Sequence, residues 1–252
     1  MLSGAAGART IIGPLNGTYT VGQPTVTVPA PNYATITAAI ADLTSRGVSG
    51  PVTFSLINPG TTPYNTANGE TFPLNVTAYA GFSAANTVTF KPALLTQPVI
   101  SNGTATALFK LTDVSYVTLD GSNTVGGSTR DLSLTNTNTG STAVVWIATS
   151  GTGLSHDNKV LNLNLQGASN ASTNLSTGVM VSSTSYNSIG ADNDNLTISN
   201  NTVQGTYMGI VAGGTTAASS GGLDGLVISN NIVGPATAAT ANNITLYGIF
   251  VQ

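Results

Sequence analysis

The stretch Leu196-Thr-Ile-Ser-Asn-Asn-Thr-Val203 decides the fold, because it recurs as Leu226-Val-Ile-Ser-Asn-Asn-Ile-Val233. Six of the eight positions are identical, and the offset of about 30 residues is typical of one turn of a solenoid. A looser copy begins earlier, at Val160. Each copy is followed by an apolar, strand-like run that begins with glycine: Gly178-Val-Met-Val181, Gly209-Ile-Val211 and Gly248-Ile-Phe-Val251. The repeat unit is therefore a strand, a turn that contains Asn, a short strand and a glycine-led strand.

A single unit of this kind cannot bury its own apolar face. Stacking successive units at the ~4.8 Å spacing of paired strands buries those faces in one core between three continuous parallel sheets. We therefore predict an all-β fold, the parallel β-helix. Stacking also places Asn162, Asn200 and Asn230 in one column, where side-chain amides can bond along the axis as a structural ladder.

The composition fits a repeating coil. Only 6% of the 252 residues are Asp, Glu, Lys or Arg, and the net charge is −3, whereas about 25% charged residues is usual. A stacked column of Lys or Glu would repel itself, so repetition along an axis favours low charge. Six Lys and Arg residues cannot neutralise many phosphates, which excludes nucleic acid as a main partner. Apolar residues make up 40% of the chain, which argues against disorder.

Two further classes of structure are disfavoured by the sequence. No apolar run approaches the ~20 residues of a membrane-spanning helix, so we expect no membrane insertion. The chain has no cysteine, and therefore neither disulfides nor thiolate metal sites.

One segment is typical of a helix. Ile36, Ile40 and Leu43 follow the i, i+4, i+7 spacing of one helix face, and Gly47 provides a stop signal. We predict a short capping helix near 33–45, at the start of a β-helix that spans 32–252, and an N-terminal extension over 1–31. Residues 4–31 are open to three interpretations: a linker, an added strand or a contact with a neighbouring copy.

The helical segment and the strand after it resemble a known family. Ala34-Thr-Ile-Thr-Ala-Ala-Ile40 leading to Gly50-Pro-Val-Thr-Phe54 resembles the opening of pectin-lyase-like right-handed β-helix proteins, in which an amphipathic helix caps the first coil. The Ile-Ser-Asn-Asn-x-Val copies resemble their repeats. The longer pattern, which includes Gly17-Thr-Tyr-Thr-Val-Gly22 and Asn86-Thr-Val-Thr-Phe-Lys91, is similar to large secreted, adhesin-like surface proteins of Bacteroidetes-type bacteria.

This resemblance covers the chain from about Gly17 to its end. It implies a right-handed β-helix of about seven turns, if each takes ~28 residues, in an extracellular or cell-surface protein. It implies no particular activity, because enzymes, adhesins and tail proteins share the scaffold.

Catalytic residues are not evident. Polysaccharide-cleaving members of the family need either a calcium-binding carboxylate cluster beside an Arg or Lys base, or several Asp residues with a His and an Arg. The nearest approach here is Asp113, Asp120, Arg130 and Asp131, on neighbouring expected turns, which we interpret as turn residues with a surface ion pair. His156, the single histidine, is interpreted as a loop residue. We therefore expect a non-enzymatic protein with no catalytic residue and no cofactor.

Three features allow a binding function. In Asp192-Asn-Asp-Asn195 the oxygens of Asp192 and Asp194 alternate as calcium ligands do, but the segment lacks the length and closing Glu of an EF-hand, so we expect a solvated turn and no metal site. Trp146, Tyr207 and Tyr247 either pack in the core and loops or stack on sugars. Irregularly spaced Thr-x-Thr pairs leave ice binding as a further alternative.

The glycine-led strands also predict a partner surface. Their alternation points Val179, Ile210 and Ile249 inward and Met180, Val211 and Phe250 outward, as an apolar column that is either covered by a loop or bare for a partner.

We expect an extracellular structural or adhesive segment of a larger bacterial surface or fibre-forming protein. Because Ile249 to Gln252 reads as a strand without a cap, we expect the coil to continue or to stack end to end on another copy. Surface glycans are a further class of partner. The alternative function is a carbohydrate-binding or degenerate polysaccharide-lyase-like module.

Overall fold

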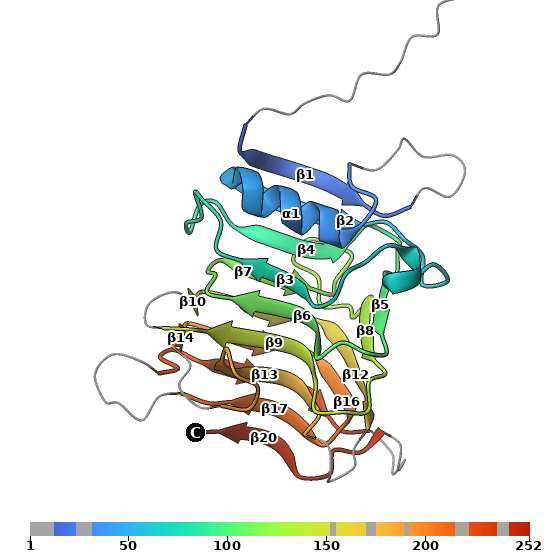
Figure 1. Cartoon of the computed structure of the whole chain (residues 1–252), viewed down its shortest axis with the longest axis vertical. Coiled ribbons are helices and arrows are strands. Elements are labelled where there is room, and N and C mark those ends of the chain that lie inside the picture. The colour runs from blue at the N-terminus through green and yellow to red at the C-terminus, as the bar shows by residue number, and fades with distance from the viewer. Residues whose placement is uncertain are drawn as a thin grey trace, which may run out of the picture.

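The strands of the computed structural model wind into a parallel β-helix of about six turns (Figure 1). The structure describes residues 13–23, 32–151, 155–169, 175–188, 192–214, 222–235 and 242–252. All strand pairs between the named strands of this described part are parallel, as the stacking of a repeated unit requires. The predicted fold class is confirmed, with about six turns in place of seven.

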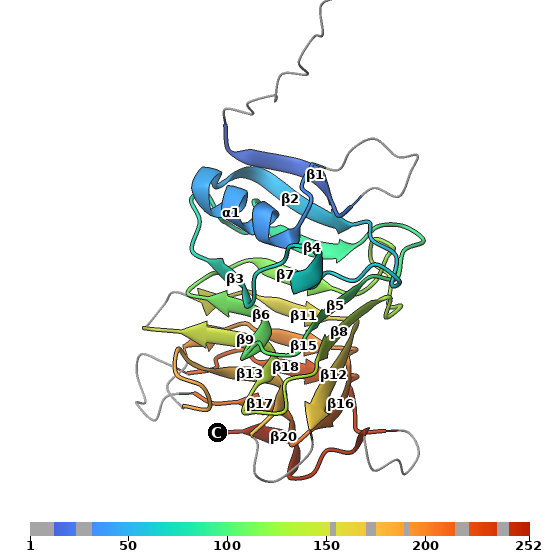
Figure 2. The ribbon, with the colours of Figure 1, turned by 45° about the vertical axis from the view of Figure 1, so that its right-hand side comes forward.

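Three sheets form the walls of the coil (Figure 2). In the described residues, sheet A consists of β1 (Leu15–Val21), β2 (Val48–Leu56), β4 (Val88–Pro92), β7 (Val117–Asp120), β11 (Lys159–Leu161), β15 (Thr197–Ser199) and β18 (Val227–Ser229). Sheet B consists of β5 (Val99–Asn102), β8 (Leu132–Asn136), β12 (Leu163–Ser169), β16 (Thr202–Thr206) and β19 (Ile232–Val233). Sheet C consists of β3 (Leu74–Thr77), β6 (Ala107–Thr112), β9 (Ala143–Thr149), β13 (Thr177–Ser183), β17 (Met208–Ala212) and β20 (Tyr247–Val251). A short pair, β10 (Ser155–His156) with β14 (Asn193–Asp194), and a 3-10 turn, Thr66–Asn68, complete the elements.

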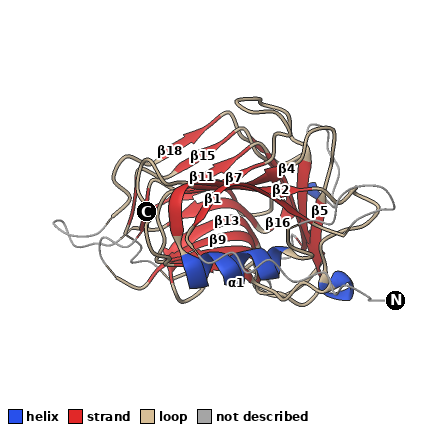
Figure 3. Ribbon diagram, turned by 90° about the horizontal axis from the view of Figure 1, so that it is seen from above, coloured by secondary structure: helices blue, strands red, loops and turns tan. Residues whose placement is uncertain are grey.

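The repeat seen in the sequence is the structural repeat. Ile198 of β15 pairs with Ile228 of β18, and Val203 of β16 pairs with Val233 of β19. Like residues therefore lie one above another, and their apolar side chains fill one core. Figure 3 looks down the stack of strands that surrounds it. In the upper turns the same rule stacks Phe54 on Phe90, with ring centroids 4.9 Å apart.

The glycine that begins the repeated strands of sheet C makes room for a valine of sheet B. A Cβ atom on Gly178 would lie 2.1 Å from Cγ1 of Val203, and one on Gly209 would lie 2.4 Å from Cγ1 of Val233. These distances are shorter than any ordinary contact, so a side chain at either glycine would displace the valine below it.

The predicted helix is present as α1 (Ile36–Arg46) and lies against β3 and β1 at one end of the stack (Figure 1). Thr35 caps it by accepting a hydrogen bond from the backbone N–H of Ala38, and Gly47, at a φ of 64°, ends it. Its apolar stripe, Ile36, Ala39, Ile40 and Leu43, is buried.

One strand lies within the segment described above as an N-terminal extension. β1 pairs in parallel with β2 over Gly17 to Val21, so residues 15–21 form an added strand, one of the three interpretations open for 4–31. Residues 1–12 and 24–31 lie outside the described part of the chain.

A buried carboxylate anchors the start of α1. Glu70, only 3% exposed, accepts hydrogen bonds from the backbone N–H groups of Ile36 and Thr37, at 2.7 and 2.9 Å, and from the Thr37 hydroxyl at 2.6 Å. These N–H groups have no partner within the helix, and a negative charge at this end is favoured by the helix dipole.

We predict that Glu70→Ala lowers the free energy of unfolding by about 1–3 kcal/mol, because buried N–H groups lose a charged acceptor. Chemical denaturation followed by circular dichroism measures the change. Ser45→Ala, at an exposed polar position of the same helix, is the matched control and should leave stability nearly unchanged. Equal stability of the Glu70 variant and the control would contradict this role.

Candidate functional site

The end of the coil opposite α1 presents an apolar surface. We call β18, β19 and β20 the last turn, because no strand of the described residues lies beyond them in the three sheets. Ile249 of β20 pairs with Ile210 of β17 and so occupies a core position. Ile249 is nevertheless 50% exposed, whereas Ile210 is fully buried. Val251 is 53% exposed, although its register partner Ala212 is fully buried.

The other two sheets end in the same way. Ile228 of β18 and Val233 of β19 are only half-buried, whereas their register partners one turn earlier, Ile198 and Val203, are fully buried. In earlier turns, the next turn of the coil covers these core positions. In the last turn no described strand does so, and its core residues are partly exposed.

The outward column expected to be a partner surface is mostly covered. Met180 and Val211 are in register on sheet C and are both buried, and Phe250 continues the column at a half-buried position. The column was expected to be either covered by a loop or bare for a partner. The structure shows that it is covered at Met180 and Val211.

The cover is built around Trp146, which precedes Met180 in the column. The Tyr186 ring packs edge-on against the indole at 5.6 Å, and its hydroxyl donates to the carbonyl of Thr142 at 2.6 Å. Burial raises the pKa of Tyr186. The ammonium of Lys110 lies over the same indole, 3.7 Å from its centroid, in a cation–π contact. Trp146 is therefore a packing residue and not an open sugar platform.

The other two candidate sugar-stacking residues differ from Trp146. Tyr207 is half-buried, whereas Tyr247 is exposed. The Tyr247 ring lies nearly parallel to that of Phe250, with centroids 4.8 Å apart and planes 17° apart. This stacked pair lies on β20, at the edge of the last turn.

The expected Asn column lies at the turn from sheet A to sheet B. Asn162, Asn200 and Asn230 all have a positive φ, between 55° and 59°, which Asn tolerates better than most residues. The amide of Asn200 donates to Oδ1 of Asn162 at 2.7 Å, and that of Asn162 donates to Asp120 at 2.7 Å. The side chain of Asn230 is exposed, so the hydrogen-bonded ladder joins Asn200, Asn162 and Asp120.

Arg130 lies in the loop between β7 and β8 and binds this ladder, and no sequence motif predicts that contact. Its guanidinium donates to the backbone carbonyl of Asn200 at 2.7 Å and to the side-chain oxygen of Asn200 at 2.6 Å. A second ladder follows one residue later, where buried Asn201 donates to Asn231 at 3.0 Å and to the carbonyl of Val160 at 2.9 Å. The Asn-Asn doublet in both sequence copies is the signal that could have revealed it.

Each residue of the nearest approach to a catalytic constellation is held by a structural contact. Asp113 follows β6 and accepts hydrogen bonds from the backbone and hydroxyl of Ser150, whereas Asp120 ends β7 and lies 3.7 Å from Nζ of Lys91. Asp131 accepts from the Thr129 hydroxyl at 2.6 Å, and Arg130 binds Asn200 as above. Each group thus has its own structural partner.

His156 and the Asp192 segment meet at the corner before sheet A. His156 lies in β10 and pairs with Asp194 of β14, so it belongs to a short strand and not to a loop. Its Nδ1 atom lies 2.8 Å from the Asp157 carboxylate, and Tyr116 packs edge-on against its ring at 4.9 Å. Burial, together with the negative charge of Asp192 and then Asp224, raises the pKa of Asp194.

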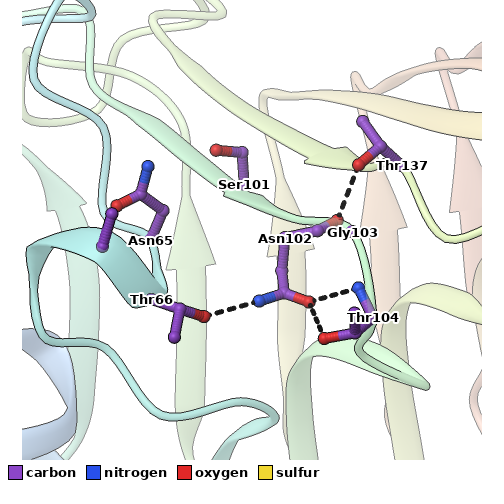
Figure 4. A pocket seen from close by; sticks show the side chains of 8 residues that line it. Asn65, Thr66, Ser101, Asn102, Gly103, Thr104 and Thr137 are labelled. Atoms are coloured by element: carbon purple, nitrogen blue, oxygen red, sulfur yellow. Dashed lines mark hydrogen bonds between the residues drawn. The ribbon is translucent and has the colours of Figure 1, made fainter.

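A hollow of about 460 Å³ opens beside sheet B and carries no charged residue (Figure 4). The amide of Asn102 crosses it to the Thr66 hydroxyl at 2.8 Å, and its oxygen accepts from the backbone N–H of Thr104 at 2.7 Å. The lining residues are Asn65, Thr66, Ala67, Ser101, Asn102, Gly103, Thr104 and Thr137. Amides and hydroxyls of this kind suit a neutral, hydroxyl-rich ligand.

The described residues offer neither a cluster of metal ligands nor a membrane-spanning helix. They contain no group of three or more His, Cys, Asp or Glu side chains placed to hold a metal ion. They also contain no helix with the length and apolarity needed to cross a membrane.

Opposite pKa shifts at two aspartates predict opposite effects of removing their charge. A raised pKa in the folded state means that stability falls as the pH rises above the ordinary value of 3.8 and Asp194 ionises. For Asp131, burial opposes ionisation, but hydrogen bonds from Thr129, Asn123 and Gln97 outweigh it and lower the pKa. Its contribution to stability is therefore present at neutral pH and is lost as the pH falls through the lowered pKa.

We expect Asp194→Asn to raise the thermal unfolding midpoint at neutral pH and Asp131→Asn to lower it. Both differences should shrink in strong acid, where both aspartates are protonated in the folded and unfolded states. Unfolding followed from neutral pH to below pH 3.8 measures both curves. A stabilising effect of Asp131→Asn at neutral pH would refute this assignment.

Comparison with known proteins identifies no relative for this chain. No protein-family model matches it, and neither a curated protein nor a solved structure does so. The fold is therefore known from the structure itself, and a function has to be argued from the surfaces described above.

Proposed function

We propose that this chain is a structural or adhesive β-helix segment of a larger extracellular bacterial protein, and that its last turn docks a further turn of β-helix. The observation that carries this proposal is the exposure of Ile249 and Val251 at positions that are buried in the preceding turns. The partner is defined by chemistry: extended strands that pair with β18, β19 and β20 and that bring apolar side chains onto the exposed core.

The energetics support docking. Full burial of an Ile or Val side chain contributes roughly 1.5–3 kcal/mol, so covering the exposed half of Ile249 and Val251 contributes about 1 kcal/mol each. The half-buried Ile228 and Val233 add to this on the other sheets. Strand pairing would also satisfy the backbone groups on the open edges.

The last turn lacks the usual protection of a free edge. Natural edge strands are commonly guarded by charged side chains, especially Lys. Residues 225–235 and 242–252 contain no Asp, Glu, Lys or Arg. An edge strand without such protection makes an isolated coil prone to aggregate, but it allows a coil with a partner to pair with that partner's strands. The low overall charge and the richness in Thr, Asn and Ser support a place on a bacterial surface.

An extended chain tests the docking role. Residues 213–252 are copied once after Gln252, so that the copied coil can cover the original last turn. We expect the amides of β20 to exchange with solvent at least tenfold more slowly than in the original chain, because they become internal strand amides. The control carries Lys at the two copied positions equivalent to Ile249 and Val251. Equal exchange in the extended chain, its control and the original would refute the docking role.

Carbohydrate binding is the second candidate, and the stacked pair of exposed Tyr247 and half-buried Phe250 favours it. Aromatic faces stack on sugar rings without needing charge. A glycan array probed with the purified chain, with Tyr247→Ala and with Val125→Ala separates the two candidates, since Val125 is exposed elsewhere. A purely structural segment predicts no glycan binding. Binding that Tyr247→Ala abolishes and Val125→Ala preserves would favour the carbohydrate-binding module.

A further inference from the structure

The hollow beside sheet B has its shape without a ligand (Figure 4). The amide nitrogen of Asn102 donates to the Thr66 hydroxyl at 2.8 Å, and its oxygen accepts from the backbone N–H groups of Thr104 and Ala105, both at 2.7 Å. The Thr137 hydroxyl donates to the Asn102 carbonyl at 3.3 Å. These bonds already hold the walls in place, so a ligand does not have to order them on binding.

Two lining side chains keep unused hydrogen-bonding groups. The oxygen of Asn65 accepts from the backbone N–H of Asn68 at 2.9 Å, whereas its amide nitrogen makes no hydrogen bond within the described residues. The same is true of the Ser101 hydroxyl. Tyr64 forms a bridge with Ile100, so the residues that follow them, Asn65 and Ser101, are neighbours, as Figure 4 shows.

The chemistry of the lining selects an uncharged, polar ligand. The lining contains no charged residue, so an ion that entered would lose water without gaining a counter-charge. An apolar ligand would leave amides and hydroxyls unpaired. Sugar hydroxyls both donate and accept, and so match the amide of Asn65 and the hydroxyl of Ser101. The volume of about 460 Å³ falls within the roughly 300–1,000 Å³ of small-molecule sites.

The hollow continues into a neutral polar column on the outer face of sheet B. Ser101 pairs with Thr135, Thr135 with Gln166, and Gln166 with Gln204. All four residues are half-buried. The strands that carry them, β5, β8, β12 and β16, contain no charged residue. A sugar chain that leaves the hollow along sheet B would therefore meet further hydroxyls and amides.

We infer that the hollow binds one unit of a neutral glycan chain and that the following units lie along the outer face of sheet B. This inference rests on the adhesive part of the proposed function and names its class of ligand. It involves no residue of the last turn, so it is independent of the docking role.

Titration of the full chain with oligosaccharides, followed by amide chemical shifts, tests the class of ligand. The probes are neutral gluco-, manno-, galacto- and xylo-oligosaccharides, their monosaccharides, and acidic oligogalacturonate. We expect at least one neutral oligosaccharide to shift the amides of Ser101, Thr104 and Thr137 and to bind more tightly than its monosaccharide. We expect no binding of the acidic probe.

Two variants remove the unused groups of the hollow. Ser101→Val deletes the hydroxyl and keeps a residue that suits a strand. Asn65→Asp keeps the oxygen that accepts from Asn68 but replaces the amide donors by a charge. Because a hydrogen bond is lost in each, we expect binding of the neutral oligosaccharide to weaken about three- to tenfold in each.

Each variant has a matched control. Thr118→Val makes the same kind of change on β7 of sheet A, at another half-buried position, and Asn230→Asp adds a charge at an exposed position. Both controls should bind as the wild type does. Circular dichroism and the thermal unfolding midpoint establish that all four variants are folded.

The outcomes separate this inference from the proposed function. Equal affinity of the hollow variants and their controls would overturn the inference, as would tighter binding of the acidic probe or equal binding of the oligosaccharide and its monosaccharide. If only Tyr247→Ala abolishes binding, the adhesive role stands and the site is wrong. If no glycan binds, the inference and glycan adhesion both fail, while slower amide exchange of β20 in the extended chain would still support docking.

Discussion

Each turn of this molecule has to stack on the one before it at the spacing of paired strands, and most other features depend on that constraint. Register pairs Ile198 with Ile228 and Val203 with Val233, so whatever occupies a position is repeated along the axis. Apolar residues, Asn and Gly profit from such repetition. Unpaired charges do not, because a column of like charges raises the energy of every turn.

Three of the charged side chains each make a single contact that is not repeated along the axis. Glu70 binds the start of α1, where helical geometry replaces a strand. Lys110 lies against Trp146, and Arg130 binds Asn200. Glu70 thus holds a helix end and Arg130 a turn, whereas Lys110 packs on an indole, and none of the three is part of a column of like charges.

The sequence predicted what repetition controls and missed what joins distant, non-repeating segments. The parallel β-helix, the short helix and the Asn162–Asn200 contact were all predictable from motifs that align with themselves or have a local period. The contact of Arg130 with Asn200 spans 70 residues of sequence, and no local pattern encodes it. The cover over Trp146 likewise depends on Tyr186 in a variable insert. The pairing of β1 with β2 was one of three open interpretations, since a single isolated strand has no copy to align with.

Repetition cannot terminate a coil, because every turn leaves strand edges and core side chains that the next turn would cover. A helical cap does so at one end, because α1 buries its apolar stripe on the core while its own hydrogen bonds satisfy its backbone. At β20 the described chain has no such element, and the side chains of Ile249 and Val251 remain half in solvent. A glycine-led strand without charge can pair with another strand but cannot repel one. The difference between the ends therefore gives the described part of the molecule a direction: α1 covers one end of the coil, and β20 leaves apolar side chains half exposed at the other.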